Sequence, residues 1–198
     1  MRRIAYLTAL LLALAGVDAR GDEIDVQQAS LVAVDEGLVL NADFAFELNP
    51  RLEEVVANGV PLYFRVEFEL TRPRWYWFDE RAALRVLQLR LSYHALSRQY
   101  RLSAGLLQQN FSSLEEALNV LKRVRNWLVA DRTTTFSDAE YEAAVRMRLD
   151  TAMLPRPFQL SALTSRELQL ESPWRRFSVR PRQVPAPVES RQPKGATP

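Results

Sequence analysis

Two stretches of the chain alternate regularly between apolar and polar side chains. Over residues 62–71 every second side chain is large and apolar, at Leu62, Phe64, Val66, Phe68 and Leu70. Residues 38–48 repeat this pattern from Leu38 to Leu48. A period of two places all the apolar side chains on one face of an extended strand. The sequence therefore predicts two strands that each bury one face.

Weaker alternation predicts further strands along the chain. They cover residues 24–34, 87–93, 100–102, 145–149 and 174–179. Asp35-Glu36-Gly37 lies between the first two strands and predicts a hairpin turn, because acidic residues followed by glycine favour tight turns. About seven to eight strands follow from these patterns.

Two short helices are indicated by their capping residues. Asn49 is a suitable N-cap with Pro50 at the first helical position, and Gly59 is placed to end that helix. Ser113 and Glu116 have the spacing of a capping box before a second helix.

Apolar residues recur at helical spacing through this second segment, at Leu114, Ala117, Leu118, Leu121 and Leu128. Lys122, Arg123 and Arg125 would then lie near the negative end of the helix dipole, which favours cations.

Many strands with few helices predict a mainly β (α+β) fold. We expect an antiparallel β-sandwich or an open barrel of about 7–8 strands, with two short helices that cap an end or cover an edge. The chain has 198 residues, a length that favours one folded domain. We expect this domain to cover residues 22–180.

The two ends of the chain differ from this body. Arg2 and Arg3 precede an apolar run at residues 4–15, and small residues follow up to Ala19. This order predicts a cleaved signal peptide over residues 1–19 and a periplasmic or secreted protein; the alternative is an uncleaved anchor. Residues 181–198 hold five prolines, which predicts a disordered basic tail.

Charge and cysteine content exclude several function classes. The chain has 26 basic and 24 acidic residues, but residues 20–172 have 18 basic and 22 acidic ones. A body with a net charge of −4 argues against nucleic-acid binding, because a polyanion partner requires a positive surface. The absence of cysteine removes thiolate nucleophiles, disulfides and cysteine-bound metals. We expect no cofactor and no metal.

Catalytic groups are sparse. His94 is the only histidine; it is either a general base or pH-sensitive contact, or a turn histidine bonded to backbone. No Gly-x-Ser-x-Gly motif or glycine-rich phosphate loop occurs. A hydrolase would need two carboxylates across a cleft, drawn from Asp79 or Glu80 with Asp43 or Glu47.

The densest feature of the sequence is an aromatic segment between charges, residues 72–80. Four consecutive aromatic residues cannot all point inward from one strand, since neighbours face opposite sides. The segment is either an aromatic platform for a ligand or a core packed from two sides. The candidate binding residues are Arg72, Arg74, Trp75, Trp77, Asp79, Glu80, His94, Arg98 and Tyr100.

Four segments carry a resemblance to a known family: Trp75 to Glu80, the run Leu91 to Ser103, Leu154-Pro155-Arg156-Pro157 and Trp174-Arg175-Arg176-Phe177. Over about residues 22–180 the chain resembles an uncharacterised family of Gram-negative bacterial signal-peptide proteins, catalogued as a domain of unknown function. The resemblance implies an extracytoplasmic single-domain protein that is associated with a membrane sensor kinase. The partners that we expect are an envelope protein or a membrane sensor protein. It supplies no catalytic residues.

Together these observations favour a periplasmic binding or interaction module. The alternative hypothesis is a carboxylate-based hydrolase that acts on an envelope polymer.

Overall fold

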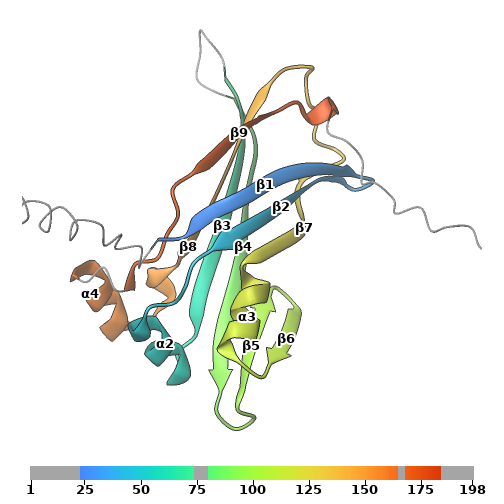
Figure 1. Cartoon of the computed structure of the whole chain (residues 1–198). Coiled ribbons are helices and arrows are strands. Elements are labelled where there is room, and N and C mark those ends of the chain that lie inside the picture. Colours follow the sequence, from blue (N-terminus) through green and yellow to red (C-terminus); the bar gives the residue numbers. More distant parts are fainter. Residues whose placement is uncertain (1–22, 74–79, 165–167, 184–198) are drawn as a thin grey trace, which may run out of the picture.

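The computed structural model describes residues 23–73, 80–164 and 168–183 (Figure 1). Its strands are β1 (Asp25–Val34), β2 (Gly37–Ala45), β3 (Leu62–Arg72), β4 (Glu80–His94), β5 (Gln99–Ala104), β6 (Leu107–Phe111), β7 (Arg123–Asp131), β8 (Tyr141–Leu149) and β9 (Arg175–Val179). Its helices are α2 (Pro50–Ala57), α3 (Leu114–Leu121) and α4 (Arg156–Thr164), with the 3-10 turns η1 (Thr151–Met153) and η3 (Pro181–Gln183).

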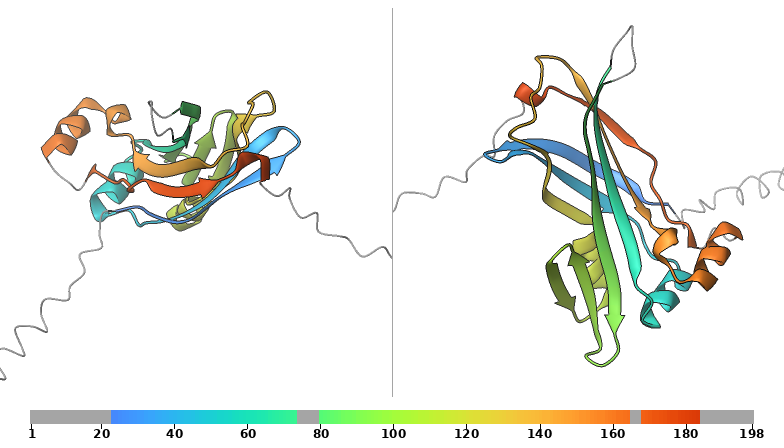
Figure 2. Two further views of the ribbon diagram at one scale, coloured as in Figure 1. Left: turned by 90° about the horizontal axis from the view of Figure 1, so that it is seen from above. Right: turned by 180° about the vertical axis from the view of Figure 1, so that it is seen from behind.

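The strands form two antiparallel sheets. One sheet has three strands in the order β1-β2-β7, and the other has six in the order β6-β5-β4-β3-β8-β9. The three-stranded sheet lies obliquely across one face of the six-stranded sheet, as the two layers in Figure 2 show. The prediction of a mainly β fold with a sandwich-like or open-barrel architecture is confirmed.

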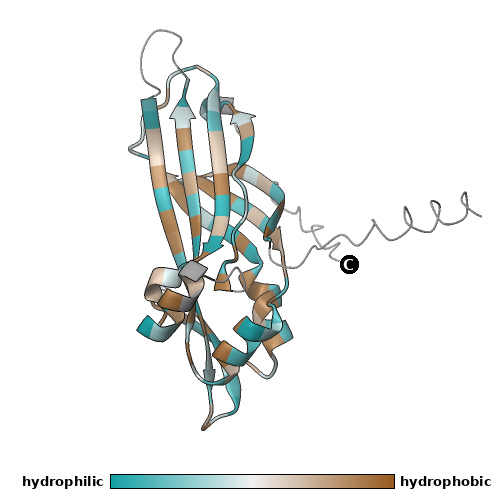
Figure 3. Ribbon diagram, turned by 90° about the vertical axis from the view of Figure 1, so that its left-hand side faces the viewer, coloured by the Kyte–Doolittle hydropathy of each residue, from teal (hydrophilic) through white to brown (hydrophobic). Residues whose placement is uncertain are grey.

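The core lies between the two sheets and is built from the alternating positions. The five apolar residues of β3, from Leu62 to Leu70, are completely buried, whereas their neighbours Tyr63, Arg65 and Glu69 are only partly buried. Figure 3 shows the same alternation of hydrophobic and hydrophilic residues along the strands. The period-two prediction for residues 62–71 is therefore confirmed.

The turn predicted at residues 35–37 is present and joins β1 to β2. Gly37 is the first residue of β2, with φ 145°, where a side chain is strained. A Cβ atom at this position would also collide with the backbone of β7, at 2.9 Å from the Cα atom of Asp131. Glycine at this position thus permits the close approach of β7.

Both predicted helices begin at the expected caps. The side chain of Asn49 accepts a hydrogen bond from the N–H of Leu52 at 2.9 Å, and Ser113 accepts one from Glu116 at 3.2 Å. The Glu116 carboxylate in turn accepts from Ser112 rather than from Ser113. Each cap satisfies an N–H that the first helical turn leaves without an intrahelical partner.

The predicted extension of the second helix is wrong. Helix α3 ends at Leu121, Lys122 is its C-cap, and strand β7 starts at Arg123. Leu128 therefore belongs to the strand. Asn126 has φ 51° and interrupts the alternation within β7, which explains why the sequence pattern did not show a strand.

Three other elements were not predicted: β6, β7 and α4. Strand β6 is almost fully exposed and has little apolar alternation. The segment predicted as a tail begins with the 3-10 turn η3, in which Pro181 is buried. The predicted signal peptide, residues 1–19, and the tail from residue 184 onward lie outside the described residues. No helix in the described ranges combines the length and apolar character needed to cross a membrane.

Candidate functional site

Arg72 and Glu80 close one end of the β3–β4 hairpin. The Arg72 guanidinium lies 2.6 Å from the Glu80 carboxylate, and it also donates a hydrogen bond to Ser137 Oγ at 2.8 Å. These two predicted residues are thus brought together as an ion pair across the two strands. The predicted site residues outside the described ranges are Arg74, Trp75, Trp77 and Asp79.

His94, Arg98 and Tyr100 lie at the other end of β4. His94 is the last residue of this strand, Arg98 is in the following turn with φ 52°, and Tyr100 is on β5. Strand β4 has 15 residues, so at about 3.3 Å per residue its two ends lie roughly 45 Å apart. The structure therefore does not bring Glu80 and His94 into one site.

The turn around His94 is held by local contacts. Ser97 Oγ lies 3.4 Å from His94 Nδ1, and the rings of Tyr93 and Tyr100 are in contact at a tilt of 48°, with 4.9 Å between their centroids. Burial, with smaller contributions from Tyr93 and Glu53, raises the pKa of Tyr100. These groups form a packed turn whose histidine is exposed to solvent.

A buried carboxylate lies on the face of the six-stranded sheet that is turned away from the three-stranded sheet. Glu67 is 8% exposed and accepts hydrogen bonds from Arg146 at 2.7 Å and from Arg148 at 3.1 Å. Arg65 approaches the same carboxylate at 3.7 Å and lies 3.4 Å from Asp150. Two carboxylates and three guanidinium groups thus form one connected network.

Electrostatics in this network favours the charged form of Glu67. Burial opposes ionisation, but the hydrogen bonds and charges of Arg146 and Arg148 outweigh it and hold the pKa of Glu67 below its ordinary value. The Arg146 guanidinium also stacks on the Trp174 ring at 4.5 Å. Because both carboxylates have partners, the network acts as a brace between β3, β8 and Trp174, the residue that precedes β9.

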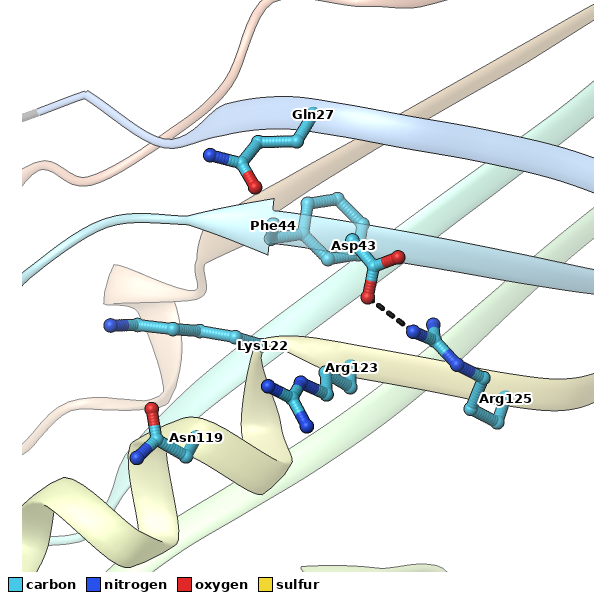
Figure 4. A pocket seen from close by; sticks show the side chains of 7 residues that line it. All are labelled: Gln27, Asp43, Phe44, Asn119, Lys122, Arg123 and Arg125. Carbon is cyan, nitrogen blue, oxygen red and sulfur yellow. Dashed lines mark hydrogen bonds and ion pairs between the residues drawn. The ribbon is translucent and has the colours of Figure 1, made fainter.

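A cationic pocket lies where β1, β2, α3 and β7 meet (Figure 4). It is a half-open depression with a volume of about 370 Å³. The residues that line it are Gln27, Asp43, Phe44, Asn119, Lys122, Arg123 and Arg125.

The junction between α3 and β7 places the cations. The helix ends immediately before Lys122, and the pairing of β7 with β2 sets Arg123 opposite Asp43. Val124 is buried, so Arg123 and Arg125, on either side of it, point outward. A short helix followed directly by a strand therefore gathers three positive charges within four positions.

Within the part of the chain that the structure describes, only one of these cations is neutralised by a carboxylate. Arg125 forms an ion pair with Asp43 and donates to the carbonyl of Ala42 at 3.0 Å. The ammonium of Lys122 lies 5.3 Å from the centroid of the Phe46 ring. Among the described residues, neither Lys122 nor Arg123 has an acidic partner within ion-pair distance.

The lining also includes two side-chain amides, Gln27 and Asn119. Both are exposed and make no hydrogen bond to any residue that the structure describes. An amide NH₂ group and a guanidinium group both donate to oxygen atoms. The pocket can therefore hold an anionic group through several donors at once.

Of the acidic residues considered for hydrolysis, the structure describes Asp43, Glu47 and Glu80, and these three do not converge; Asp79 lies outside the described residues. Asp43 lines the cationic pocket and is paired with Arg125, whereas Glu47 follows β2 and Glu80 begins β4 in the other sheet. The described part of the chain also has no group of three or more metal-ligating side chains. The pocket thus offers one engaged carboxylate instead of the two that a glycosidase mechanism uses.

Comparison with known proteins identifies the domain. A family model described as a domain of unknown function (DUF4390) matches residues 21–178. The chain belongs to this family. No curated protein and no solved structure matches it. The match spans all nine described strands except the last residue of β9, so the DUF4390 domain includes both sheets and the cationic pocket.

The sequence alone did not identify the pocket of this DUF4390 domain. In the sequence pattern, Lys122, Arg123 and Arg125 have the spacing of charges that suit the end of a helix. A useful signal was nevertheless present, because three cations within four positions are unusual in a body whose net charge is −4.

Proposed function

We propose that this DUF4390 protein is a periplasmic binding module that holds an anionic group of its ligand in the cationic pocket. The observation that carries this proposal is the presence of Lys122 and Arg123 in the pocket without an acidic partner among the described residues. Two cations gathered at one place repel each other, and an anionic ligand relieves that repulsion.

The periplasmic location rests on the sequence of residues 1–19, which has the order of a signal peptide. An envelope component or a membrane sensor protein that presents an anionic group is the partner class that we propose. The folded unit covers residues 22–180 in this proposal, followed by a basic tail.

Binding explains the described geometry better than hydrolysis does. The alternative of a carboxylate-based hydrolase needs two acidic groups in one concave site. Asp43 is the only acid among the described residues that line the cationic pocket, and it is already engaged in an ion pair with Arg125. His94, the one histidine, lies in an exposed turn at the end of β4.

A binding titration with two charge-matched variants tests this proposal. The mature full chain is titrated with sodium phosphate, succinate and acetate at constant ionic strength, with calorimetry as the readout. The pocket variant carries Lys122→Gln and Arg123→Gln. The control carries Arg175→Gln and Arg180→Gln, which removes two exposed cations whose side chains make no hydrogen bond or ion pair with any described residue.

We expect the unmodified chain and the control to bind at least one anion, and the pocket variant to lose at least about tenfold in affinity. Circular dichroism checks that all three proteins are folded. Equal binding by the pocket variant, or no saturable binding by the unmodified chain, would refute the proposal.

A further inference from the structure

The cationic pocket carries a surplus of two positive charges. Lys122, Arg123 and Arg125 contribute three, and Asp43 is the one acid among the lining residues. A ligand group with a charge of −2 would neutralise this surplus. A single carboxylate or a phosphodiester, each with a charge of −1, would leave one cation without a partner.

The hydrogen-bond donors of the pocket are spread around it instead of forming two donors in one plane. Figure 4 shows Asn119, Lys122 and Arg123 on one side, Gln27 above them, and the Asp43–Arg125 pair on the other side. A carboxylate has two oxygen atoms in one plane, whereas a phosphate group presents three terminal oxygen atoms in a tetrahedral arrangement. Several donors from different directions therefore suit a phosphate group better.

We propose that the anionic group is a phosphomonoester in its dianionic form, held by Lys122 and Arg123 with donors from Asn119 and Gln27. This inference rests on the anion-binding function proposed above and narrows it to one ligand chemistry. The pocket volume of about 370 Å³ leaves room for a small group that carries the phosphate.

Asp43 sets the net charge of the pocket in this proposal. Its carboxylate engages Arg125 and keeps the surplus at two charges instead of three. An Asp43→Asn substitution frees Arg125 and removes a negative charge close to the ligand. Because the pocket then holds three cations and no acid, we expect this variant to bind methyl phosphate about threefold to tenfold more tightly than the unmodified chain does, and dimethyl phosphate to gain less because its charge is smaller.

The charge of the ligand, and not that of the protein, sets the expected pH dependence. The second pKa of a phosphomonoester is about 6, so at pH 5 only about a tenth of it is dianionic. The ionisable groups that line the pocket are Asp43 on β2, Lys122 at the end of α3, and Arg123 and Arg125 on β7; no histidine lines it. We therefore expect methyl phosphate to bind about tenfold more weakly at pH 5 than at pH 7.5.

The deciding experiment is a calorimetric titration of the full mature chain with four probes at both pH values and at constant ionic strength. The probes are methyl phosphate, dimethyl phosphate, succinate and sulfate. We expect methyl phosphate to bind most tightly at pH 7.5 and to weaken at pH 5. Sulfate keeps its charge of −2 at both pH values, so its affinity is expected to stay constant. An equal loss of sulfate binding at pH 5 would assign the pH effect to the protein and overturn the inference.

The failure of this inference can be told apart from failure of the proposed function. If succinate binds as tightly as methyl phosphate and the Lys122→Gln, Arg123→Gln variant loses this binding, the assignment of a phosphomonoester is overturned but the anion-binding pocket is kept. If this variant binds every probe as tightly as the unmodified chain does, both the phosphomonoester assignment and the proposed anion-binding function are overturned. The Arg175→Gln, Arg180→Gln control shows in each case whether a loss is specific to the pocket.

Two sources can supply a phosphomonoester, and a further pair of probes distinguishes them. Glycerol 3-phosphate represents a soluble ligand, and phosphatidylcholine vesicles with phosphatidic acid represent a lipid headgroup. If the unmodified chain sediments with these vesicles and the pocket variant does not, the phosphate group belongs to a lipid. Binding of glycerol 3-phosphate without sedimentation assigns it to a soluble ligand, and failure of both overturns the inference.

Discussion

Replacing Glu67 by glutamine tests the carboxylate network on the six-stranded sheet. Glutamine keeps the shape of the side chain but removes the charge that Arg146 and Arg148 contact at 2.7 and 3.1 Å. It also turns one acceptor oxygen into an NH₂ donor, which then faces a guanidinium donor. Three arginines would remain around a neutral group.

The expected cost follows from the two hydrogen bonds. A bond to a charged group contributes about 1.5–3 kcal/mol and a neutral one about 0.5–1.5 kcal/mol, so the lost charge costs about 1 kcal/mol per bond. The arginine side chains are 28% and 30% exposed, and solvent screening prevents a larger value. We therefore expect Glu67→Gln to lower the free energy of unfolding by about 2 kcal/mol at pH 7.

The loss should depend on pH in a defined direction. The network holds the pKa of Glu67 below its ordinary value, so its contribution is complete above the unfolded-state pKa of about 4.3. It disappears as the pH falls through the lower pKa of the folded state. The difference between the unmodified chain and Glu67→Gln should therefore shrink below about pH 4.

Urea unfolding followed by circular dichroism at pH 7 and pH 3 measures both effects. Glu69→Gln is the matched control, because Glu69 lies on the same face of β3 and makes no ion pair with any described residue. A loss in Glu67→Gln that is no larger than that in the control, or one that is as large at pH 3 as at pH 7, would show that the reasoning is wrong.

Three further predictions concern local structure. Ser113→Ala removes the N-cap of α3 and should cost about 1 kcal/mol in urea unfolding. Gly37→Ala should destabilise the protein by more than about 2 kcal/mol, because the new Cβ atom collides with the backbone of β7. Gly105→Ala should cost about 1 kcal/mol, because φ is 59° but the space around the Cβ position is open. Thermal unfolding of the two variants measures the difference. Burial and the neighbouring Tyr93 raise the pKa of Tyr100, so a tyrosine absorbance titration should show one phenol that ionises above the usual pH of about 10. The free energy of unfolding should fall as the pH rises through about 10, because Tyr100 ionises first in the unfolded chain.

Local patterns predicted much of the fold. The alternation of β3, the cap at Asn49 and the cap at Ser113 depend on neighbouring residues, and the structure confirms each of them. The extent of β7 was not predictable in the same way, because Asn126 in the left-handed region breaks the alternation and Leu128 is 41% exposed. The mostly exposed strand β6 offers no apolar pattern to recognise.

The candidate site was harder to predict than the fold because it depends on long-range pairing. Arg72 and Glu80 are near in sequence and do form a pair, but His94 proved to be at the far end of the same strand. The cationic pocket combines Gln27, Asp43 and Lys122 from distant segments. No spacing within one segment could show that these residues meet.

The pairing of β2 with β7 has a consequence for the order of folding. Strands β3 to β6 pair with their sequence neighbours, whereas the register of β2 joins Gly37 to Asp131 across most of the domain. Closing so long a loop is entropically costly and slow, so this contact forms late. The cationic pocket needs both strands, so we expect it to be incomplete in the transition state for folding. A ligand bound there therefore slows unfolding and leaves the folding rate unchanged.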